Sequence, residues 1–133
     1  MLEPCYLAGF FDGEGSISPA HNNSGRSLRV CLHNNYKPIL DEVNEQFPGT
    51  VHKQGTSNCW QWTAQSASSQ HAFLTFVLPH LKLRLEEAKI ALAIVSTITK
   101  GRTKLTDQEF LVRETLFELL AAAADRRKQP FNG

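Results

Sequence analysis

A strict two-residue alternation in residues 28–33, within the run 26–33, constrains the fold more than any other feature of the sequence. Leu28, Val30 and Leu32 alternate there with polar side chains and a cysteine. Successive side chains of a β-strand point to opposite faces, so this run predicts a strand with one buried face and one wet face. The preceding residues 22–25 read Asn-Asn-Ser-Gly, which is typical of a hairpin turn. Residues 16–22 are therefore predicted to form the partner strand.

A second hairpin is predicted over residues 50–65. Its strands would be residues 50–54 and 58–65, with Gly55 near the turn. Val51, Trp60 and Trp62 take the buried parity of these strands. The opposite parity of the two hairpins carries mainly polar side chains, namely Arg29, His33, Thr50, His52, Gln54, Gln61 and Thr63.

Helical segments separate and follow the hairpins. The first is predicted from Pro4 to about Gly13, because proline suits the first helical position and glycine ends a helix. The second is predicted over residues 38–47. The third would begin at a cap at Ser68 or Ser69 and end at Leu78, before Pro79. The fourth is predicted over residues 83–97, and the last would run from a capping box at 106–109 to about Arg126. This order predicts an α+β fold, with one antiparallel sheet and helices on one of its faces.

The distribution of charge indicates more than its total. The 14 Lys and Arg residues against 13 Asp and Glu give a net charge of +1, which by itself argues against a strongly cationic nucleic-acid binder. However, neither residues 15–40 nor residues 46–85 contain an acid, and these stretches include both predicted hairpins. The polar sheet face is therefore expected to lack acids, and Arg and Gln side chains can read base edges in the DNA major groove. A merely solvated sheet face is the alternative.

Three further features bear on where such a chain works. No run of 18 apolar residues predicts a membrane span, and the N-terminus lacks the basic and apolar stretches of a secretory signal. The three cysteines show no metal-like spacing, and their odd number fits reduced thiols inside a cell. We therefore expect an intracellular protein without a membrane partner, in a bacterial or phage-infected cytoplasm or an organelle matrix.

Residues 7–15 read Leu-Ala-Gly-Phe-Phe-Asp-Gly-Glu-Gly and resemble the signature of the LAGLIDADG homing endonucleases. The match includes the Leu-Ala-Gly start, the acids at the sixth and eighth positions and the closing glycine. Residues 59–62 and 78–84 also look like family segments. The resemblance implies an αββαββα core with a saddle-like antiparallel sheet over about residues 3–99. Residues 1–133 would then form a single domain, with a C-terminal helical extension over about residues 105–127.

The motif also has a physical interpretation of its own. Gly9 and Gly13 are four residues apart and share a helix face, so a second helix could approach closely there. Glu14 would lie at the helix C-terminus, where carboxylate and carbonyl oxygens together suit a hard cation such as Mg²⁺. Two copies of the helix would bring two Glu14 carboxylates together, and divalent metal would relieve their repulsion. Such metals can activate water and stabilise the leaving oxygen of a phosphodiester. The alternative is a glycine-rich helix end with a solvated glutamate.

The resemblance implies specific roles around the metal. Glu14 would be the catalytic acid and the Mg²⁺ ligand, the carbonyl of Gly13 the second metal contact, and Mn²⁺ a candidate substitute. Asp12 is expected to cap or brace the helix. The basic residue that the family places near the scissile phosphate matches Arg84 best, with Lys82 as the alternative, and a plain surface cation competes with either.

One position departs from the family pattern. A polar side chain often positions water at the end of the second strand in the family, but the residue in register here is Leu32. His33 and Asn34 are the candidates to replace it.

The motif occurs once, and single-motif members of the family are homodimers. The expected partners are therefore a second copy of the chain and double-stranded DNA with a near-palindromic site. The predicted dimer contacts are Leu7, Gly9, Phe10 and Gly13. The predicted DNA-binding residues are Ser18, Asn22, Asn23, Arg26, Arg29, His33, His52, Lys53, Gln54, Gln61 and Thr63.

The resemblance thus implies an intron-encoded homing endonuclease, and together with the motif it predicts a protein that cuts DNA at a long, near-palindromic site by Mg²⁺-dependent hydrolysis. An intron RNA maturase and a non-cleaving DNA-binding protein of the same fold are the alternatives, together with a metal-free interaction module. The last helix is expected to pack on the helical layer, and the basic residues 126–128 are expected to be mainly solvated.

Overall fold

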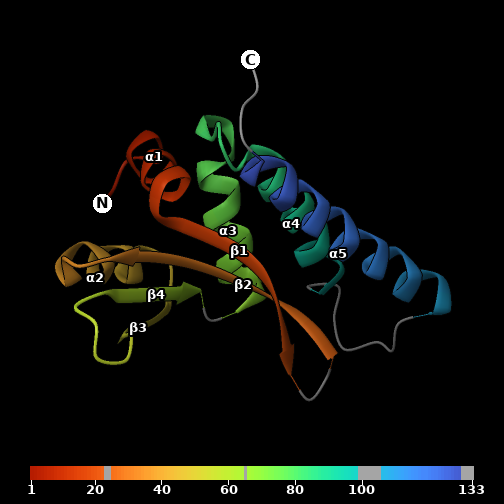
Figure 1. Ribbon diagram of the computed structural model, residues 1–133, viewed down its shortest axis with the longest axis horizontal. Coiled ribbons are helices and arrows are strands. Elements are labelled where there is room, and N and C mark those ends of the chain that lie inside the picture. Colours follow the sequence, from red (N-terminus) through yellow and green to blue (C-terminus); the bar gives the residue numbers. More distant parts are fainter. Residues whose placement is uncertain (23–24, 65, 99–105, 130–133) are drawn as a thin grey trace.

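The computed structural model describes residues 1–22, 25–64, 66–98 and 106–129 (Figure 1). The elements follow in the order α1 (Pro4–Glu14), β1 (Gly15–Asn22), β2 (Gly25–Asn34), α2 (Lys37–Gln46), β3 (Gly49–Lys53), β4 (Trp60–Ala64), α3 (Ala67–Val77), a 3-10 turn η1 (Leu78–His80), α4 (Leu85–Ile98) and α5 (Asp107–Lys128). The predicted α+β architecture is confirmed, with two hairpins that join into one antiparallel sheet of order β1-β2-β4-β3.

The strand register places the alternating hydrophobic residues together on one face of the sheet. Ile17 pairs with Val30 across the first hairpin, and Leu32 pairs with Trp62 where the two hairpins meet. Val30, Leu32 and Trp62 are fully buried, and Ile17 is nearly so. The period of two in the sequence therefore identified the buried face correctly, because only one parity of each strand can face the helices.

The side chains on the opposite face of the sheet are less exposed to solvent than the alternation predicts. Arg29 and His52 are exposed there, but Cys31 and Gln61 retain only 1% and 7% of their accessible surface. Both lie in the middle of the sheet, where Cys31 pairs with Thr63 and His33 pairs with Gln61. Their cross-strand neighbours cover them, so a position on the polar face of the sheet does not by itself make a side chain accessible.

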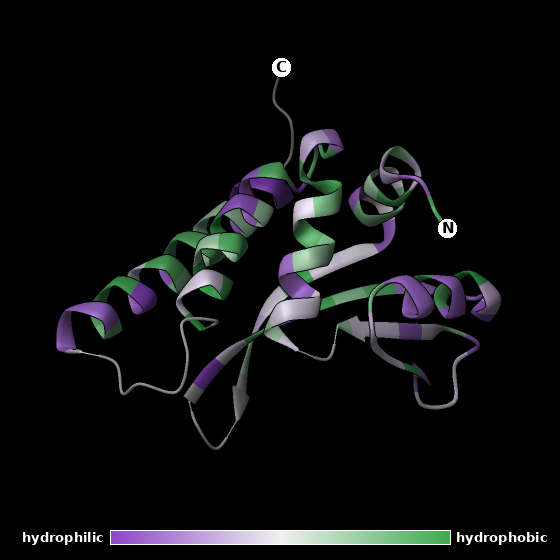
Figure 2. Ribbon diagram, turned by 180° about the vertical axis from the view of Figure 1, so that it is seen from behind, coloured by the Kyte–Doolittle hydropathy of each residue, from purple (hydrophilic) through white to green (hydrophobic). Residues whose placement is uncertain are grey.

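The helices cover the hydrophobic face of the sheet, and the core lies between the two layers (Figure 1). Phe73 of α3 is at its centre, with ring centroids 5.3 Å from Phe11, 5.3 Å from Phe47 and 5.0 Å from Trp62. Figure 2 shows hydrophobic residues along α3 and along the paired helices α4 and α5. The aromatic contacts fix how α1 and α3 lie on the sheet, and thereby where α1 ends.

The helix boundaries differ from the predictions by a few residues. The cap of α3 is Ser66 rather than Ser68 or Ser69, because the Ser66 side chain accepts a hydrogen bond from the amide of Ser69. The hydroxyl of Ser69 instead donates to the carbonyl of Pro48 at 2.7 Å. The predicted capping box of the last helix is confirmed, with Thr106 and Glu109 bonded reciprocally.

Only part of α5 packs on the helical layer. Phe117, Leu120 and Ala123 are buried, mainly against α4. The first turns of α5 leave large hydrophobic side chains exposed, namely Phe110, Leu111 and Val112. The prediction for this helix therefore holds for its C-terminal half. Within the described residues, none of the helices has the length and apolar character that crossing a membrane requires.

Candidate active site and nucleic-acid face

Glu14 is the last residue of α1, and its side chain is exposed where the chain turns into β1. Gly13 before it is exposed as well. The described residues contain no group of three or more His, Cys, Asp or Glu side chains that could hold a metal ion. A cation bound at Glu14 would therefore need further ligands from backbone carbonyls, a second chain or a phosphate. Oxygen atoms of these kinds are the ligands that Mg²⁺ prefers.

Asp12 fixes the last turn of α1 to a segment far along the chain. One oxygen of its carboxylate accepts a hydrogen bond from the amide of Lys82 at 2.9 Å, and the other accepts from the amide of Arg84 at 3.0 Å. Asp12 was expected to cap or brace its own helix. It instead braces the residues that lead into α4, where free backbone amides need an acceptor.

Arg84 is held by the same part of α1. Its Nε donates to the carbonyl of Phe11 at 3.0 Å, and its guanidinium lies 6.0 Å from the centre of the Phe11 ring. The side chain is 11% exposed. Burial lowers the pKa of the Arg84 guanidinium and the charge of Arg127 lowers it further, whereas Glu87 and Asp12 raise it. Of the two cations predicted near the scissile phosphate, Lys82 is therefore the exposed one and Arg84 is already engaged inside the chain.

The basic tail contacts the same cluster. Arg127 pairs with the buried Glu87, and the neighbouring Arg126 pairs with the exposed Glu86. Arg84 lies 3.9 Å from the second oxygen of Glu87, which has no hydrogen-bond partner among the described residues. The prediction that residues 126–128 are mainly solvated is wrong for Arg127. No local pattern could reveal these pairs, because 40 residues separate their partners.

His33 lies beside the end of α1. Its Nδ1 is 3.4 Å from the carbonyl oxygen of Glu14, and its Nε2 is 3.1 Å from Oε1 of Gln61. Leu32 is fully buried, as its parity predicts. Asn34, the other candidate to replace it, uses its side-chain oxygen to accept from the amide of Tyr36 at 2.8 Å. Of the two candidates, the fold brings His33 next to Glu14.

Gln61 connects the side chains of the sheet face. Its Nε2 donates to Thr63 Oγ1 at 2.9 Å and to Cys31 Sγ at 3.1 Å, and its Oε1 accepts from Gln54. These bonds use both ends of the amide. Gln61 therefore holds its neighbours in place rather than presenting free groups to solvent.

The other predicted DNA-binding residues fall into two groups. Ser18 and Arg29 pair across the first hairpin on the open face, and His52 lies on the same face of β3. Arg26 instead has the parity of the buried face, with its guanidinium 3.1 Å from Glu114 and 5.6 Å from the ring centre of Phe117 in α5.

Three further DNA-binding predictions involve β3 or the first hairpin turn. Lys53 is exposed at the end of β3, with the parity of the buried face. Asn23 lies outside the described residues, as does the side chain of Asn22. The described strand side chains on the open face, namely Ser16, Ser18, Ala20, Ser27, Arg29, Cys31, His33, Thr50, His52, Gln61 and Thr63, include no acid.

The outer face of α1, which carries Gly9 and Gly13, is uncovered in the described chain apart from the turn η1, which contacts it at Cys5. A Cβ atom at Gly9 or Gly13 would meet nothing within 4 Å. Tyr6 on the same helix is 54% exposed, with its ring 6.3 Å from that of the half-buried Phe10. Leu7, a predicted dimer contact, is fully buried in the chain's own core and does not lie on this face.

Comparison with known proteins identifies the fold. No protein-family model and no curated protein matches the sequence. Among solved structures, the homing endonuclease I-CvuI in complex with DNA is 20% identical, with a TM-score of 0.75 over 96% of this chain and 85% of that chain. The archaeal intron-encoded homing endonuclease I-Vdi141I, also complexed with DNA, is 15% identical, with a TM-score of 0.75 over 98% and 85%. I-SmaMI bound to DNA is 21% identical, with a TM-score of 0.68 over 92% of this chain but 49% of that chain.

These similarities extend over almost the whole chain, including the helical extension. Together with the motif at residues 7–15, which ends α1 and opens β1, they agree with the architecture described above. The chain thus has the fold of the LAGLIDADG homing endonucleases, the family that its first helix resembles.

Proposed function

We propose that this chain is a site-specific endonuclease that cuts double-stranded DNA. The observation that carries the proposal is the position of Glu14, an exposed carboxylate at the border between α1 and an acid-free sheet face. His33 joins the two regions, because it contacts the carbonyl of Glu14 on one side and Gln61 on the other. The DNA complexes of I-CvuI and I-Vdi141I, which have the same fold, support the proposal.

Glu14 would bind the divalent metal through its carboxylate, and Gly13 through its carbonyl. Mg²⁺ is the metal we propose, with Mn²⁺ as a substitute, and it would supply activation of water and charge stabilisation at the phosphate. The remaining chemistry belongs to the chain itself. Asp12 fixes the end of α1 relative to Lys82, and the exposed ammonium of Lys82 would stabilise charge on the phosphate. Arg84 would hold the last turn of α1 through Phe11 rather than contact DNA.

The open sheet face would contact the DNA. Arg29 and His52 are exposed there and carry donors that suit base edges or phosphates in the major groove. Ser18, Gln54, Thr63 and Lys53 would add contacts around them. Gln61 would orient His33 and Gln54 through its hydrogen bonds instead of reading a base.

We further propose that the enzyme is a homodimer joined through the outer face of α1. Gly9 and Gly13 leave room there for a second backbone. This chain corresponds to about half of I-SmaMI, as a single copy of a paired arrangement would. A twofold axis between two α1 helices would make the preferred DNA site near-palindromic.

A cleavage selection tests this function. The wild-type protein is incubated with a library of random DNA duplexes and Mg²⁺, and the cut sites are sequenced. We expect a near-palindromic consensus in the cut products, and no cutting when EDTA replaces Mg²⁺. Binding of DNA without cutting in either Mg²⁺ or Mn²⁺ would contradict the endonuclease and favour a DNA-binding protein. Tight binding to a structured intron RNA, again without DNA cleavage, would favour a maturase.

A further inference from the structure

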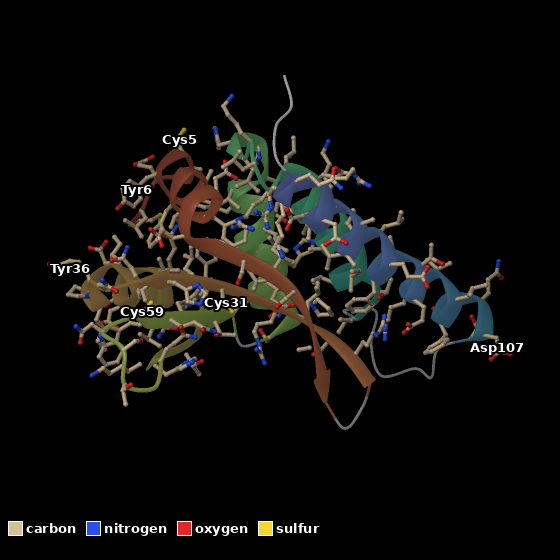
Figure 3. All side chains as sticks on the ribbon, viewed as in Figure 1. Cys5, Tyr6, Cys31, Tyr36, Cys59 and Asp107 are labelled. Carbon is tan, nitrogen blue, oxygen red and sulfur yellow. The ribbon has the colours of Figure 1, made fainter. Side chains whose placement is uncertain are left out.

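A cysteine and a histidine that the proposed function does not use lie together at the N-terminal end of α1. The sulfur of Cys5 is 3.5 Å from Nδ1 of His80, which belongs to the turn η1. Both side chains are exposed. Figure 3 shows Cys5 at the outer end of α1, at the opposite end of the helix from the sheet. The pair is therefore remote from Glu14, which ends the same helix.

The separation of the two atoms fits one edge of a tetrahedral zinc site. Zinc binds a cysteine sulfur at about 2.3 Å and a histidine nitrogen at about 2.0–2.1 Å, which places the two ligand atoms about 3.5 Å apart in a tetrahedron. The measured separation is 3.5 Å, so the sulfur and the nitrogen already lie at the distance that two ligands of one zinc ion require. The first turn of a helix is also a favourable place for the negative charge of a metal-bound thiolate.

One chain supplies only two of the four ligands. The described residues contain no further histidine, cysteine or acid that would complete a metal site with this pair. Cys5 precedes Gly9 by four residues and Gly13 by eight, so all three lie on one face of α1. In the proposed homodimer, two copies of this face meet about the twofold axis. The axis would bring a second Cys5 and a second His80 to the first pair and give a Cys₂His₂ set.

We propose that Cys5 and His80 form one half of a structural zinc site, which the same two residues of a second copy complete. This inference rests on the homodimer of the proposed function. All four ligands come from protein, so the site has no open position for a reacting water and its role is to hold the two α1 helices together. It would take a thiolate-seeking metal, whereas the oxygen ligands at Glu14 suit Mg²⁺.

Metal analysis of the purified protein tests the proposal. The chain is prepared under reducing conditions without chelator, and its zinc content is measured by atomic spectroscopy. We expect about one zinc ion per two chains. Replacement of zinc by Co²⁺ should give the visible absorption of a tetrahedral site together with a thiolate-to-metal charge-transfer band. Cys5→Ser and His80→Asn should each lose the zinc and the charge-transfer band.

Two matched variants serve as controls. Cys59→Ser changes the half-buried cysteine before β4, and His71→Ala changes an exposed histidine of α3, so both should keep the zinc. Circular dichroism on every variant checks that the chain is folded. Because Cys5 and His80 are both exposed, their variants should fold like wild type.

The molar mass in solution separates failure of this inference from failure of the proposed function. A dimer that cuts DNA but holds no zinc would overturn the zinc site and leave the endonuclease in place. A chain that stays monomeric at all concentrations would overturn both the homodimer and the shared site. One zinc ion per monomer, or zinc retained by Cys5→Ser, would also contradict the proposal.

Discussion

The two faces of α1 have opposite environments within one eleven-residue helix. Leu7, Ala8 and Phe11 are fully buried against the chain's own core. Gly9 and Gly13 face open space instead, although glycine is costly inside a helix. Packing explains the residues on the inner face. It does not explain the glycines on the outer face, because a Cβ atom at either position would meet no atom of the described chain within 4 Å. The difference between the two faces supports the proposal that the outer face of α1 meets a second copy of the chain.

The largest effect should come from removing the ring that anchors the inner face. Phe11→Ala deletes a fully buried side chain that packs edge-to-face on Phe73. We expect the free energy of unfolding to fall by about 3–5 kcal/mol, as for other buried phenylalanines. Urea denaturation measures it. Tyr6→Ala on the outer face is the matched variant, and in the monomer it should stay within about 0.5 kcal/mol of wild type. Equal losses for the two variants would remove the distinction between the faces.

Gly15 tests whether a glycine of the motif can be structural. A Cβ atom there would lie 2.3 Å from a ring carbon of Phe11 and 2.6 Å from its carbonyl oxygen. Gly15→Ala should therefore destabilise the fold by about 1–3 kcal/mol, the usual cost of overpacking. Gly9→Ala should have the opposite sign in the monomer, with a gain of up to about 1 kcal/mol from helix propensity. Thermal unfolding of both variants in dilute solution makes the comparison, and a stabilised Gly15→Ala would contradict it.

Asp12 tests the link between α1 and the start of α4. Asp12→Ala removes the acceptors of two backbone amides, those of Lys82 and Arg84, so we expect a loss of about 1–2 kcal/mol as for a helix cap. Asp41→Ala breaks the exposed pair with Lys37 and should cost about 0.5 kcal/mol or less. Hydrogen exchange at the amides of Lys82 and Arg84 should accelerate only in Asp12→Ala. Unchanged exchange there would show that Asp12 does not brace this segment.

The smallest change in folding stability, with a clear change in assembly, is expected at Gly13. Gly13→Ala adds a methyl group in open space, so the monomer should be stabilised by up to about 1 kcal/mol. In the proposed dimer the same methyl group would separate the two helices and weaken association. Sedimentation across a concentration range measures this. Unchanged association would place the dimer contact on another surface.

Local patterns predicted much of the fold. The alternation at Leu28, Val30 and Leu32 identified a buried sheet face, because strand parity depends only on neighbouring residues. The motif also located Glu14 at the end of α1, because the glycines that end the helix are its neighbours in the sequence. Helix boundaries were less accurate, since the cap of α3 depends on which serine can reach a free amide.

Contacts between distant segments could not be predicted. Arg26 forms an ion pair with Glu114 of α5, and Arg84 donates a hydrogen bond to the carbonyl of Phe11 in α1. An arginine in a sequence shows its charge but not the partner that the fold brings to it. The same holds for Gln61, whose polarity indicated an accessible residue although its neighbours cover it. The sequence therefore predicted the position of Glu14 in the fold, but it did not predict the contacts of the side chains around it.

The cleavage rate of Glu14→Gln tests the central claim most directly. The variant keeps the shape of the side chain and removes its charge, and Glu3→Gln, at the other end of α1, is the matched control. On a cleavable DNA site with saturating Mg²⁺, we predict that Glu14→Gln binds like wild type but cuts at least about a hundredfold more slowly, or about 2.7 kcal/mol in activation free energy. Glu3→Gln should cut at the wild-type rate. Cleavage by Glu14→Gln at the wild-type rate would contradict the assignment of Glu14 as the metal-binding catalytic residue.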